Sequence, residues 1–406
     1  MPRRADPVVV VAVARTPMGA FQGALSTLSA PDLGAQALRA VLGRAGMEAD
    51  AGAERLGPNG EVLMGCVLSA GVGQAPARQA ALLAALPTST PCTTVNKVCG
   101  SGMKAVMLAH DQLMVGGAEW MLAGGMESMS QAPYLLPKAR AGQRLGHGQM
   151  LDHMFLDGLE DAYGADTRGR LMGTFAEDCA RHHGFTRAQQ DDFAVASTTR
   201  AQQAMREGRF DWEVAPVSVP ARGSRVDVTQ DEQPLKAQLD RIATLKPAFA
   251  PDGTVTAANA SSISDGAAAL LLMRRSQAEA RGMAPLAVIR GHATHAQEPA
   301  WFTTSPVGAM QRLLDRVGWC VADVDLWEIN EAFAVVALAA MQALNLPHER
   351  VNVHGGACAL GHPIGASGAR ILVTLMGALR HHGLRRGVAS LCIGGGEATA
   401  IALEMC

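Results

Sequence analysis

The stretch Val95-Asn-Lys-Val-Cys99-Gly-Ser-Gly-Met-Lys-Ala-Val-Met-Leu-Ala109 decides the fold, because it combines a strand end, a sharp turn and a buried helix. Val95 and Val98 favour a strand, and the glycines of Gly100-Ser-Gly102 favour a tight turn before the helix. A further apolar run, Met121-Leu-Ala-Gly124-Gly125, then ends in glycines. This order of elements predicts an α/β fold with a parallel or mixed sheet covered by helices.

A second stretch near the C-terminus repeats this pattern. Gly365-Ala-Ser-Gly-Ala-Arg-Ile-Leu-Val373 has the Ser-Gly turn and the apolar helix, and Ser390-Leu-Cys-Ile-Gly394-Gly-Gly396 has the strand that ends in glycines. The spacing is 23 residues from Ser101 to Gly124 and 27 from Ser367 to Gly394. Chance is an alternative in a chain with 44 glycines. We predict a duplication, with two similar α/β domains packed face to face.

Other elements extend this prediction. Apolar and capping patterns predict strands at Val8–Val13 and Val62–Leu68 and helices from Asp32, as N-cap, to Gly43 and over Ala75–Leu86. From about residue 131 to 260 the chain is richer in charge, Gly and Pro, and Thr186-Arg-Ala-Gln189 has capping-box spacing. We therefore expect a domain of residues 1–128 plus 264–284, an inserted loop domain of residues 129–263, and a second domain of residues 285–406.

Composition excludes several classes of protein. The 406 residues are 48% hydrophobic and 18% charged, and the formal charge of −2 gives no general attraction to nucleic acid or to an anionic membrane. The eight cysteines form no C-x-x-C pair, which argues against a zinc site or a disulfide framework. Met1-Pro-Arg-Arg4 resembles the start of a signal peptide, but the following apolar run, Val8–Ala14, is too short. We expect a cytoplasmic protein that does not bind metal, membrane or nucleic acid.

Cys99 lies where a nucleophile would be placed. A cysteine at a helix start is expected to have a lowered pKa, because the helix dipole and free N–H groups favour the thiolate. The same N–H groups can stabilise an oxyanion. A buried structural cysteine is the alternative, since this is the usual fate of a free thiol.

Three further segments carry polar groups in unusual places. His362 is fixed between Gly361 and Pro363, which suits a general base with a pKa near neutral pH. Cys392 ends an apolar strand, where burial would raise the pKa of its thiol and suit it to acid or base chemistry. Glu328-Ile-Asn330-Glu331 places polar residues inside an apolar run, where burial is costly without a role.

Together these segments resemble the thiolase family. The matching motifs, in family order, are Asn96-Lys-Val-Cys-Gly-Ser-Gly-Met-Lys104, Gly124-Gly-Met-Glu-Ser-Met129, Asn330-Glu-Ala-Phe333, Gly361-His-Pro363 and Cys392-Ile-Gly-Gly-Gly396. The resemblance runs from Arg15-Thr-Pro17 to the C-terminus. The loop Met150–Tyr163 is most similar to acetyl-CoA acetyltransferases, which condense two acetyl-CoA into acetoacetyl-CoA and CoA. The family also implies an α/β fold of two duplicated βαβαβ-type domains in αβαβα layers with an inserted loop domain, and a tetramer built as a dimer of dimers.

The resemblance implies a ping-pong mechanism without a bound cofactor, in which coenzyme A thioesters are the substrates. His362 takes the proton of Cys99, whose thiolate attacks the thioester and keeps the acyl group. Cys392 removes an α-proton from a second acetyl-CoA. His362 and a water on Asn330 stabilise the enolate, and the N–H groups of Cys99 and Gly394 form the second oxyanion hole.

Family positions also suggest substrate contacts. The residues expected around the pantetheine are Leu159, Met172, Ala248, Phe249, Ser261, Ala332 and Phe333, although each apolar one also suits an ordinary core. Lys236 or Arg241 is expected to bind the CoA phosphates, with plain surface charge as the alternative. Phe302 either closes the acyl pocket or packs in the core.

Other functions are weighed against this one. A degradative 3-ketoacyl-CoA thiolase has the same catalytic residues and a roomier pocket, whereas a ketoacyl synthase has His at the position of Cys392. A non-catalytic lipid-binding relative would not need Cys99, His362 and Cys392. Gly71-Val-Gly73 lacks the third glycine and the following acid of a dinucleotide site.

Overall fold

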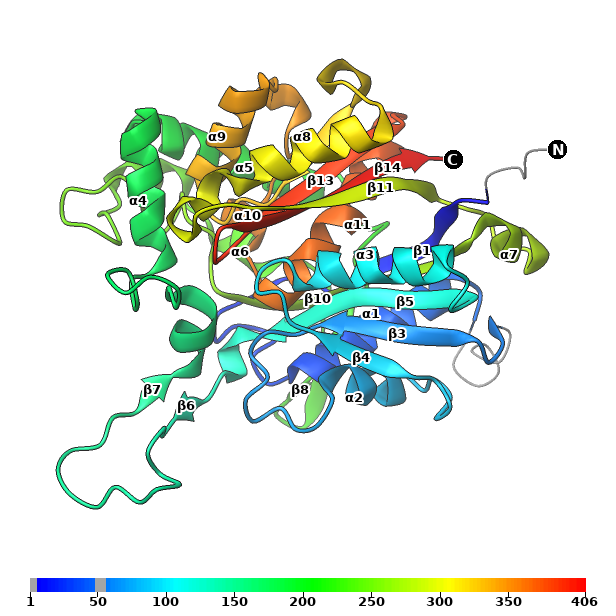
Figure 1. The fold of residues 1–406 in the computed structure, drawn as a ribbon, viewed down its shortest axis with the longest axis horizontal. Coiled ribbons are helices and arrows are strands. Elements are labelled where there is room, and N and C mark those ends of the chain that lie inside the picture. Colours follow the sequence, from blue (N-terminus) through cyan, green and yellow to red (C-terminus); the bar gives the residue numbers. More distant parts are fainter. Residues whose placement is uncertain (1–5, 48–55) are drawn as a thin grey trace.

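Two mixed β-sheets face each other across a layer of helices (Figure 1). The computed structural model describes residues 6–47 and 56–406, so Met1–Arg4 lies outside the described residues. The first sheet has the order β1 (Val8–Arg15), β10 (Ser264–Arg274), β5 (Trp120–Ser128), β3 (Gly60–Gly65) and β4 (Cys92–Val95). The second has the order β11 (Ala287–Ala296), β14 (Glu397–Met405), β13 (Arg386–Ile393) and β12 (Leu326–Ile329).

The two sheets repeat one topology. In the first, β1 and β10 and then β10 and β5 pair antiparallel, whereas β5, β3 and β4 run parallel. In the second, β11 and β14 and then β14 and β13 pair antiparallel, whereas β13 and β12 run parallel. A parallel bridge from Trp327 to Val351 stands where β4 stands in the first sheet. The predicted duplication is therefore confirmed. The sheets also join at one edge through β1 and β11, a contact that the sequence did not predict.

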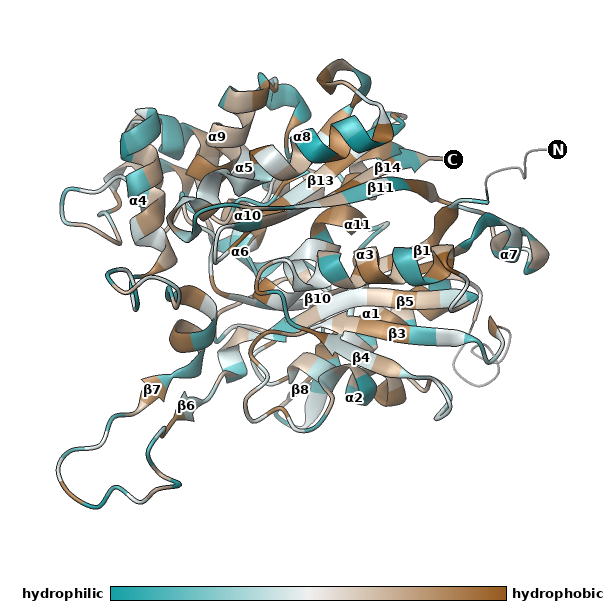
Figure 2. Cartoon of the chain, viewed as in Figure 1, coloured by the Kyte–Doolittle hydropathy of each residue, from teal (hydrophilic) through white to brown (hydrophobic). Residues whose placement is uncertain are grey.

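Two helices fill the space between the sheets. These are α3 (Ser101–Met114) and α11 (Ile364–His382), the two helices that open with a Ser-Gly turn. They approach so closely that a Cβ atom on Gly368 would lie 2.4 Å from the backbone nitrogen of Met103. Figure 2 shows hydrophobic residues on these helices and on β3 and β5, as expected for a buried middle layer. Small residues at this crossing bring the starts of both helices together.

Outer helices complete the layers. The first sheet is covered by α1 (Ala30–Arg44) and α2 (Pro76–Leu83), and α8 (Ser305–Val317), with α9 (Ala334–Leu344) beside it, covers the second. Ser29, not Asp32, is the N-cap of α1, and Asp32 completes a capping box from the third helical position. Strand β3 ends at Gly65 instead of Leu68, because the Glu127 carboxylate accepts the N–H groups of Val67 and Leu68.

The segment between β5 and β10 forms its own group of elements beside the layers. Its helices are α4 (Met172–His183), α5 (Arg187–Arg206) and the short α6 (Glu232–Lys236), and both capping-box bonds predicted at Thr186 are present. A long hairpin with β6 (Tyr134–Leu135) and β7 (Leu151–Asp152) projects from the body (Figure 1). The remaining short elements are β2 (Gly19–Ala20), α7 (Arg275–Ala280), α10 (Ala357–Leu360) and the hairpin of β8 (Val217–Ala221) and β9 (Ser224–Val228). Within the described residues, no helix has the length and apolar character needed to cross a bilayer.

Candidate active site

A cavity of about 360 Å³ opens where the starts of α3 and α11 meet the inserted segment. Cys99, His362 and Gly394 line it, from three segments more than 30 residues apart in the chain. Its volume lies within the range of small-ligand sites, and most of its surface is apolar. The duplicated turns therefore bring a thiol and an imidazole to one enclosed space.

Cys99 sits on a strained turn between β4 and α3. Val98, a β-branched residue, adopts a φ of 47°, a conformation that costs energy for such a side chain. The Ser101 hydroxyl donates to the carbonyl of Val98 (2.6 Å) and accepts from the N–H of Lys97 (2.8 Å), which holds the turn. Strain held in this way fixes the direction of the Cys99 side chain.

The pKa of Cys99 is raised, contrary to the expectation from its place before a helix. Burial raises it to about 11, although N–H groups of Gly394 and of Cys99 itself hydrogen-bond the sulfur and lower it in part. Burial outweighs those groups because the inserted segment covers the turn with apolar side chains such as Phe155 and Leu159. Backbone N–H groups held in this way can also stabilise negative charge that develops on a nearby oxygen.

His362 presents one free nitrogen. Its Nδ1 lies 2.5 Å from the hydroxyl of Ser367, and among the described residues its Nε2 has no hydrogen-bond partner. Gly361 has a φ of 99°, and a Cβ there would lie 2.0 Å from the Ser264 hydroxyl, so only glycine fits before the histidine. Burial lowers the pKa of His362 to about 3, not to near neutrality as expected. At pH 7 the ring is neutral and able to accept a proton.

Cys392 and Asn330 lie in fully buried positions at the ends of β13 and β12, outside the lining of the cavity. Burial raises the pKa of Cys392, and the nearby Cys99 thiol raises it further, so the two sulfur atoms are electrostatically coupled. Neither the side-chain oxygen nor the nitrogen of Asn330 has a partner within the described part of the chain. An amide buried in this way is suited to hold a polar ligand or a water.

Comparison with known proteins identifies the family to which this fold belongs. The model of the thiolase N-terminal domain matches residues 8–276, and that of the thiolase C-terminal domain matches residues 283–405. The chain belongs to the thiolase family. An acetyl-CoA acetyltransferase of Cupriavidus necator is 48% identical over 399 residues, which are 98% of this chain and 99% of the relative.

Other relatives extend this likeness. Acetyl-CoA acetyltransferase 2 of Arabidopsis thaliana is 49% identical over 401 residues, 98% of this chain and 97% of the relative. The crystal structure of the Ascaris suum thiolase Acat5 in complex with coenzyme A superposes with a TM-score of 0.89 at 40% identity, over 98% of this thiolase and 100% of that chain.

Most of the substrate contacts predicted for this thiolase meet in the cavity. Its lining includes Leu159, Met172, Ala248, Phe249, Ser261, Phe302, Ala332 and Phe333. Lining residues that the sequence reasoning missed include Phe155, Leu171, Ile263 and Ile364. Gly158 comes near the side chain of Ile364, which places the start of α11 against the Met150–Tyr163 loop. The missed residues are apolar and were indistinguishable from core in the sequence.

Lys236 and Arg241 lie apart from the catalytic groups, in an adjoining pocket of about 330 Å³. The two pockets share Ala257 and Ser262 in their linings, so they lie side by side. Lys236 pairs with Glu232 (2.5 Å), and the Arg241 guanidinium donates to the side chain of Gln238 (3.2 Å). Both cations are exposed, so they can contact an anion in the adjoining pocket.

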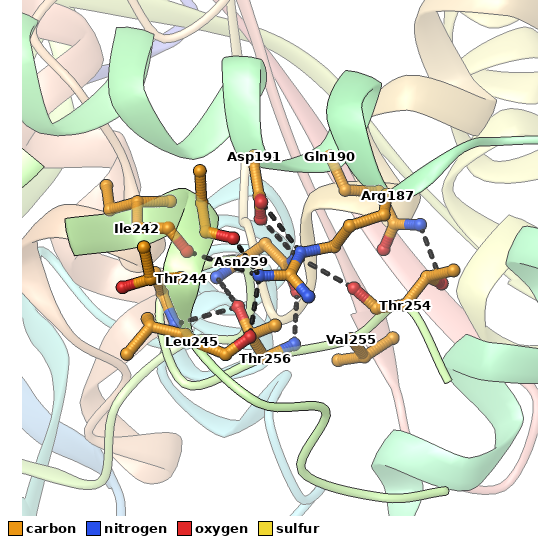
Figure 3. A network of polar contacts seen from close by, with 12 residues as sticks. Arg187, Gln190, Asp191, Ile242, Thr244, Leu245, Thr254, Val255, Thr256 and Asn259 are labelled. Atoms are coloured by element: carbon orange, nitrogen blue, oxygen red, sulfur yellow. Dashed lines mark hydrogen bonds and ion pairs between the residues drawn. The ribbon is translucent and has the colours of Figure 1, made fainter. Parts of the chain in front are cut away.

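A polar network holds the segment before Ser261 (Figure 3). Arg187 on α5 pairs with Asp191 (2.6 Å) and donates to the carbonyl of Leu245 (2.8 Å). The Asn259 amide donates to Asp191 (3.0 Å), and its oxygen accepts the N–H of Thr256 (2.7 Å). These contacts attach helix α5 to the segment that lines both pockets.

Glu127, in the motif Gly124–Met129, joins the two halves beneath the site. Its carboxylate accepts the N–H groups of Val67 (3.0 Å) and Leu68 (3.1 Å) from the first half and of Gly365 (2.8 Å) from the second. Burial raises its pKa to about 7. The sequence signal for Glu127 was an acidic residue within the motif Gly124–Met129, which the structure shows to be a fully buried strand. The motif did not reveal the hydrogen-bond partners of the carboxylate.

Proposed function

We propose that this thiolase is an acetyl-CoA acetyltransferase, which joins two acetyl-CoA molecules into acetoacetyl-CoA and CoA and catalyses the reverse reaction. The observation that carries the proposal is the meeting of Cys99 and the free Nε2 of His362 in one apolar cavity, with the buried thiol of Cys392 close enough to Cys99 to be electrostatically coupled to it. The names of the relatives from Cupriavidus necator and Arabidopsis thaliana support the same substrate.

In the first half-reaction His362 takes the proton of Cys99, and the sulfur attacks the thioester carbonyl. The N–H groups of Cys99 and Gly394, which already bind the sulfur, stabilise the oxyanion. The carbon–sulfur bond to CoA breaks, and Cys392 gives its proton to the departing CoA sulfur. The products are acetyl-Cys99, protonated His362, CoA and the Cys392 thiolate, so atoms and charge balance.

In the second half-reaction the Cys392 thiolate removes an α-proton from a second acetyl-CoA. His362 and a water held by the unpartnered amide of Asn330 stabilise the enolate oxygen. The enolate carbon attacks acetyl-Cys99, the carbon–sulfur bond breaks, and the Cys99 sulfur recovers its proton from His362. No resident cofactor or metal takes part in this scheme.

The substrate would enter past the adjoining pocket. We assign the CoA phosphates to Lys236 and Arg241, whose pocket opens beside the cavity, and the pantetheine to the wall formed by Ala248, Phe249 and Ser261. Phe302 would close the acyl end.

The assembly and location follow as part of the proposal. We expect a cytoplasmic homotetramer, formed by two dimers that meet through the β6–β7 hairpin. Support for association comes from β4 at the edge of its sheet and from exposed apolar side chains on the hairpin, such as Leu145. All eight cysteines are free thiols, which suits a reducing compartment.

Mass spectrometry after an acid quench tests the central claim. Protein mixed with acetyl-CoA should carry one acetyl group on the peptide that contains Cys99, and Cys99→Ser should lose activity by several orders of magnitude, since a hydroxyl is far harder to ionise than a thiol. Acetyl on Cys392, or on neither thiol, contradicts the assignment of roles. Thiolysis measured from C4 upward separates this function from that of a degradative thiolase.

A further inference from the structure

A second cluster of reactive side chains lies away from the cavity, where α3 meets β11. His110 and Asp111 belong to α3, and His292 belongs to the first strand of the second half. One ligand atom from each residue lies within 4.8 Å of the others. The Asp111 carboxylate oxygen is 2.8 Å from Nε2 of His292 and 3.1 Å from Nδ1 of His110.

The two histidine side chains of this cluster are largely buried, whereas the carboxylate is exposed to solvent. The His110 and His292 side chains are 15% and 13% exposed, whereas that of Asp111 is 53% exposed. The imidazole rings stand edge to face, with centroids 5.1 Å apart. The cluster is therefore fixed by the protein on one side and reachable from solvent at the carboxylate.

The three ligand atoms converge on one point. Both imidazoles face the same carboxylate oxygen, Oδ1 of Asp111. A metal ion binds a deprotonated carboxylate and a neutral imidazole through its ring lone pair, so these side chains are of the types that a cation requires.

We propose that His110, Asp111 and His292 bind one Zn²⁺ ion, with water as the fourth ligand. Two imidazoles and one carboxylate are typical ligands of zinc, whereas Ca²⁺ and Mg²⁺ prefer oxygen alone. Binding would place the ring N–H of each histidine on the nitrogen that does not face Asp111. No local sequence pattern indicates this cluster, because His110 and His292 are 182 positions apart.

The place of the site in the fold indicates what the ion would do. Cys99 precedes α3, and His110 lies 11 residues further on, roughly 16 Å along a helix. The ion would tie the far end of the nucleophile's helix to the second half of the chain. It would stabilise the fold and take no part in the chemistry, so this inference does not depend on the proposed function.

Metal analysis of the full-length protein tests the site. Chelator-treated protein, titrated with Zn²⁺ and then desalted, should retain one ion per chain and unfold at a temperature several degrees higher. His292→Gln and His110→Gln should each lose the ion and the shift, and His382→Gln, from another pair of adjacent histidines, should keep both. Equal retention in wild type, His292→Gln and His110→Gln overturns the proposal, as does loss in His382→Gln alone.

Co²⁺ provides a readout on the unaltered chain. A site of two imidazoles and a carboxylate should give tetrahedral visible bands without the charge-transfer band of a thiolate. A thiolate band would mean that the metal binds cysteine, which would overturn the proposal. The rate of acetoacetyl-CoA thiolysis should be the same with and without Zn²⁺, and a metal-dependent rate would contradict the structural role.

Discussion

The hydroxyl of Ser367 determines which nitrogen of His362 is free. The Ser367 Oγ donates its own hydrogen to the carbonyl of Pro363 (2.9 Å), so towards Nδ1 of His362, 2.5 Å away, it can only accept. The proton of the neutral ring is therefore on Nδ1, and the lone pair is on Nε2. In the duplicated turn, Ser101 likewise donates to the carbonyl of Val98. Corresponding serines, Ser101 and Ser367, therefore stabilise the two duplicated turns.

Ser367→Ala should weaken His362 as a base without changing its place. When the ring is protonated, the bond from Nδ1 to Ser367 becomes charge-assisted, and its loss costs about 1.5–3 kcal/mol. We expect acetylation of Cys99, measured by rapid quench, to slow roughly tenfold to a hundredfold and its pH profile to shift.

Thr374→Val is the matched control for Ser367→Ala. It removes another buried hydroxyl from α11, one that donates to Glu213 and not to His362. Both variants should lose stability, measured by urea unfolding. If both shift the pH profile of acetylation equally, Ser367 has only a structural role.

Cys392→Ser should separate the two half-reactions. Acetyl transfer to Cys99 should survive at a reduced rate, since Cys99 and His362 remain, whereas carbon–carbon bond formation should fall by several orders of magnitude. Quenched mass spectrometry measures the first and acetoacetyl-CoA formation the second. Cys179→Ser, which changes another fully buried thiol, should affect the two steps alike. Equal losses in Cys392→Ser would contradict the division of labour.

The raised pKa of Cys99 predicts its reactivity in the free enzyme. Below a pKa of about 11 the thiolate fraction rises tenfold with each unit of pH, so alkylation by iodoacetamide should accelerate across pH 7 to 10 without a plateau. Free cysteine, with an ordinary pKa of about 8.5, should level off within this range. A plateau for Cys99 below pH 8 would instead indicate a thiolate paired with protonated His362.

Much of the framework was predictable because it depends on residues close in sequence. The strand from Val8, the capping box at Thr186 and the repeated Ser-Gly turns are local patterns, and the structure contains each of them. The pairing of β1 with β11 and the end of β3 depend on distant partners. Nothing near Leu68 in the sequence reveals that its N–H group donates a hydrogen bond to Glu127.

The pKa values of the site residues were harder to predict than the identity of those residues. Short motifs located Cys99 and His362, and both line the cavity. The direction of the Cys99 pKa was wrong, because the sequence shows the helix that favours a thiolate but not the apolar cover that opposes it. A pKa depends on the balance of burial and hydrogen bonds, and both arise only after folding.

Shortening the hairpin between β6 and β7 tests its role in assembly. Residues 136–150 are all exposed, including Leu136, Leu145 and Met150, so their removal costs little core. Replacing them with a short turn should convert a tetramer into a dimer by light scattering. Shortening the β8–β9 turn at Arg222–Gly223 is the control and should leave a tetramer. A tetramer without residues 136–150 would show that another surface joins the dimers.

The last prediction concerns chain length. Phe302 lines the cavity, is 3% exposed, and packs edge to face against Phe175 with ring centroids 6.4 Å apart. A ring held in this way cannot easily move aside, and forcing extra methylenes into a packed site costs about 1–3 kcal/mol. Wild type should therefore cleave acetoacetyl-CoA roughly tenfold to a hundredfold faster than a C8 ketoacyl-CoA. Phe302→Ala should narrow that gap.

Trp301→Ala is the control for Phe302→Ala, because Trp301 packs against His182 instead of lining the cavity. It should leave the preference for short chains unchanged. Phe302→Ala also removes a core side chain, which should lower the free energy of unfolding by about 3–5 kcal/mol. The rates are therefore compared as the ratio of C4 to C8 thiolysis within each variant, because any loss of folded protein affects both rates equally. Efficient C8 thiolysis by the wild type would indicate a degradative thiolase. An unchanged ratio in Phe302→Ala would place the end of the acyl pocket at another residue, since a wall that excludes long chains by bulk must admit them when the bulk is removed.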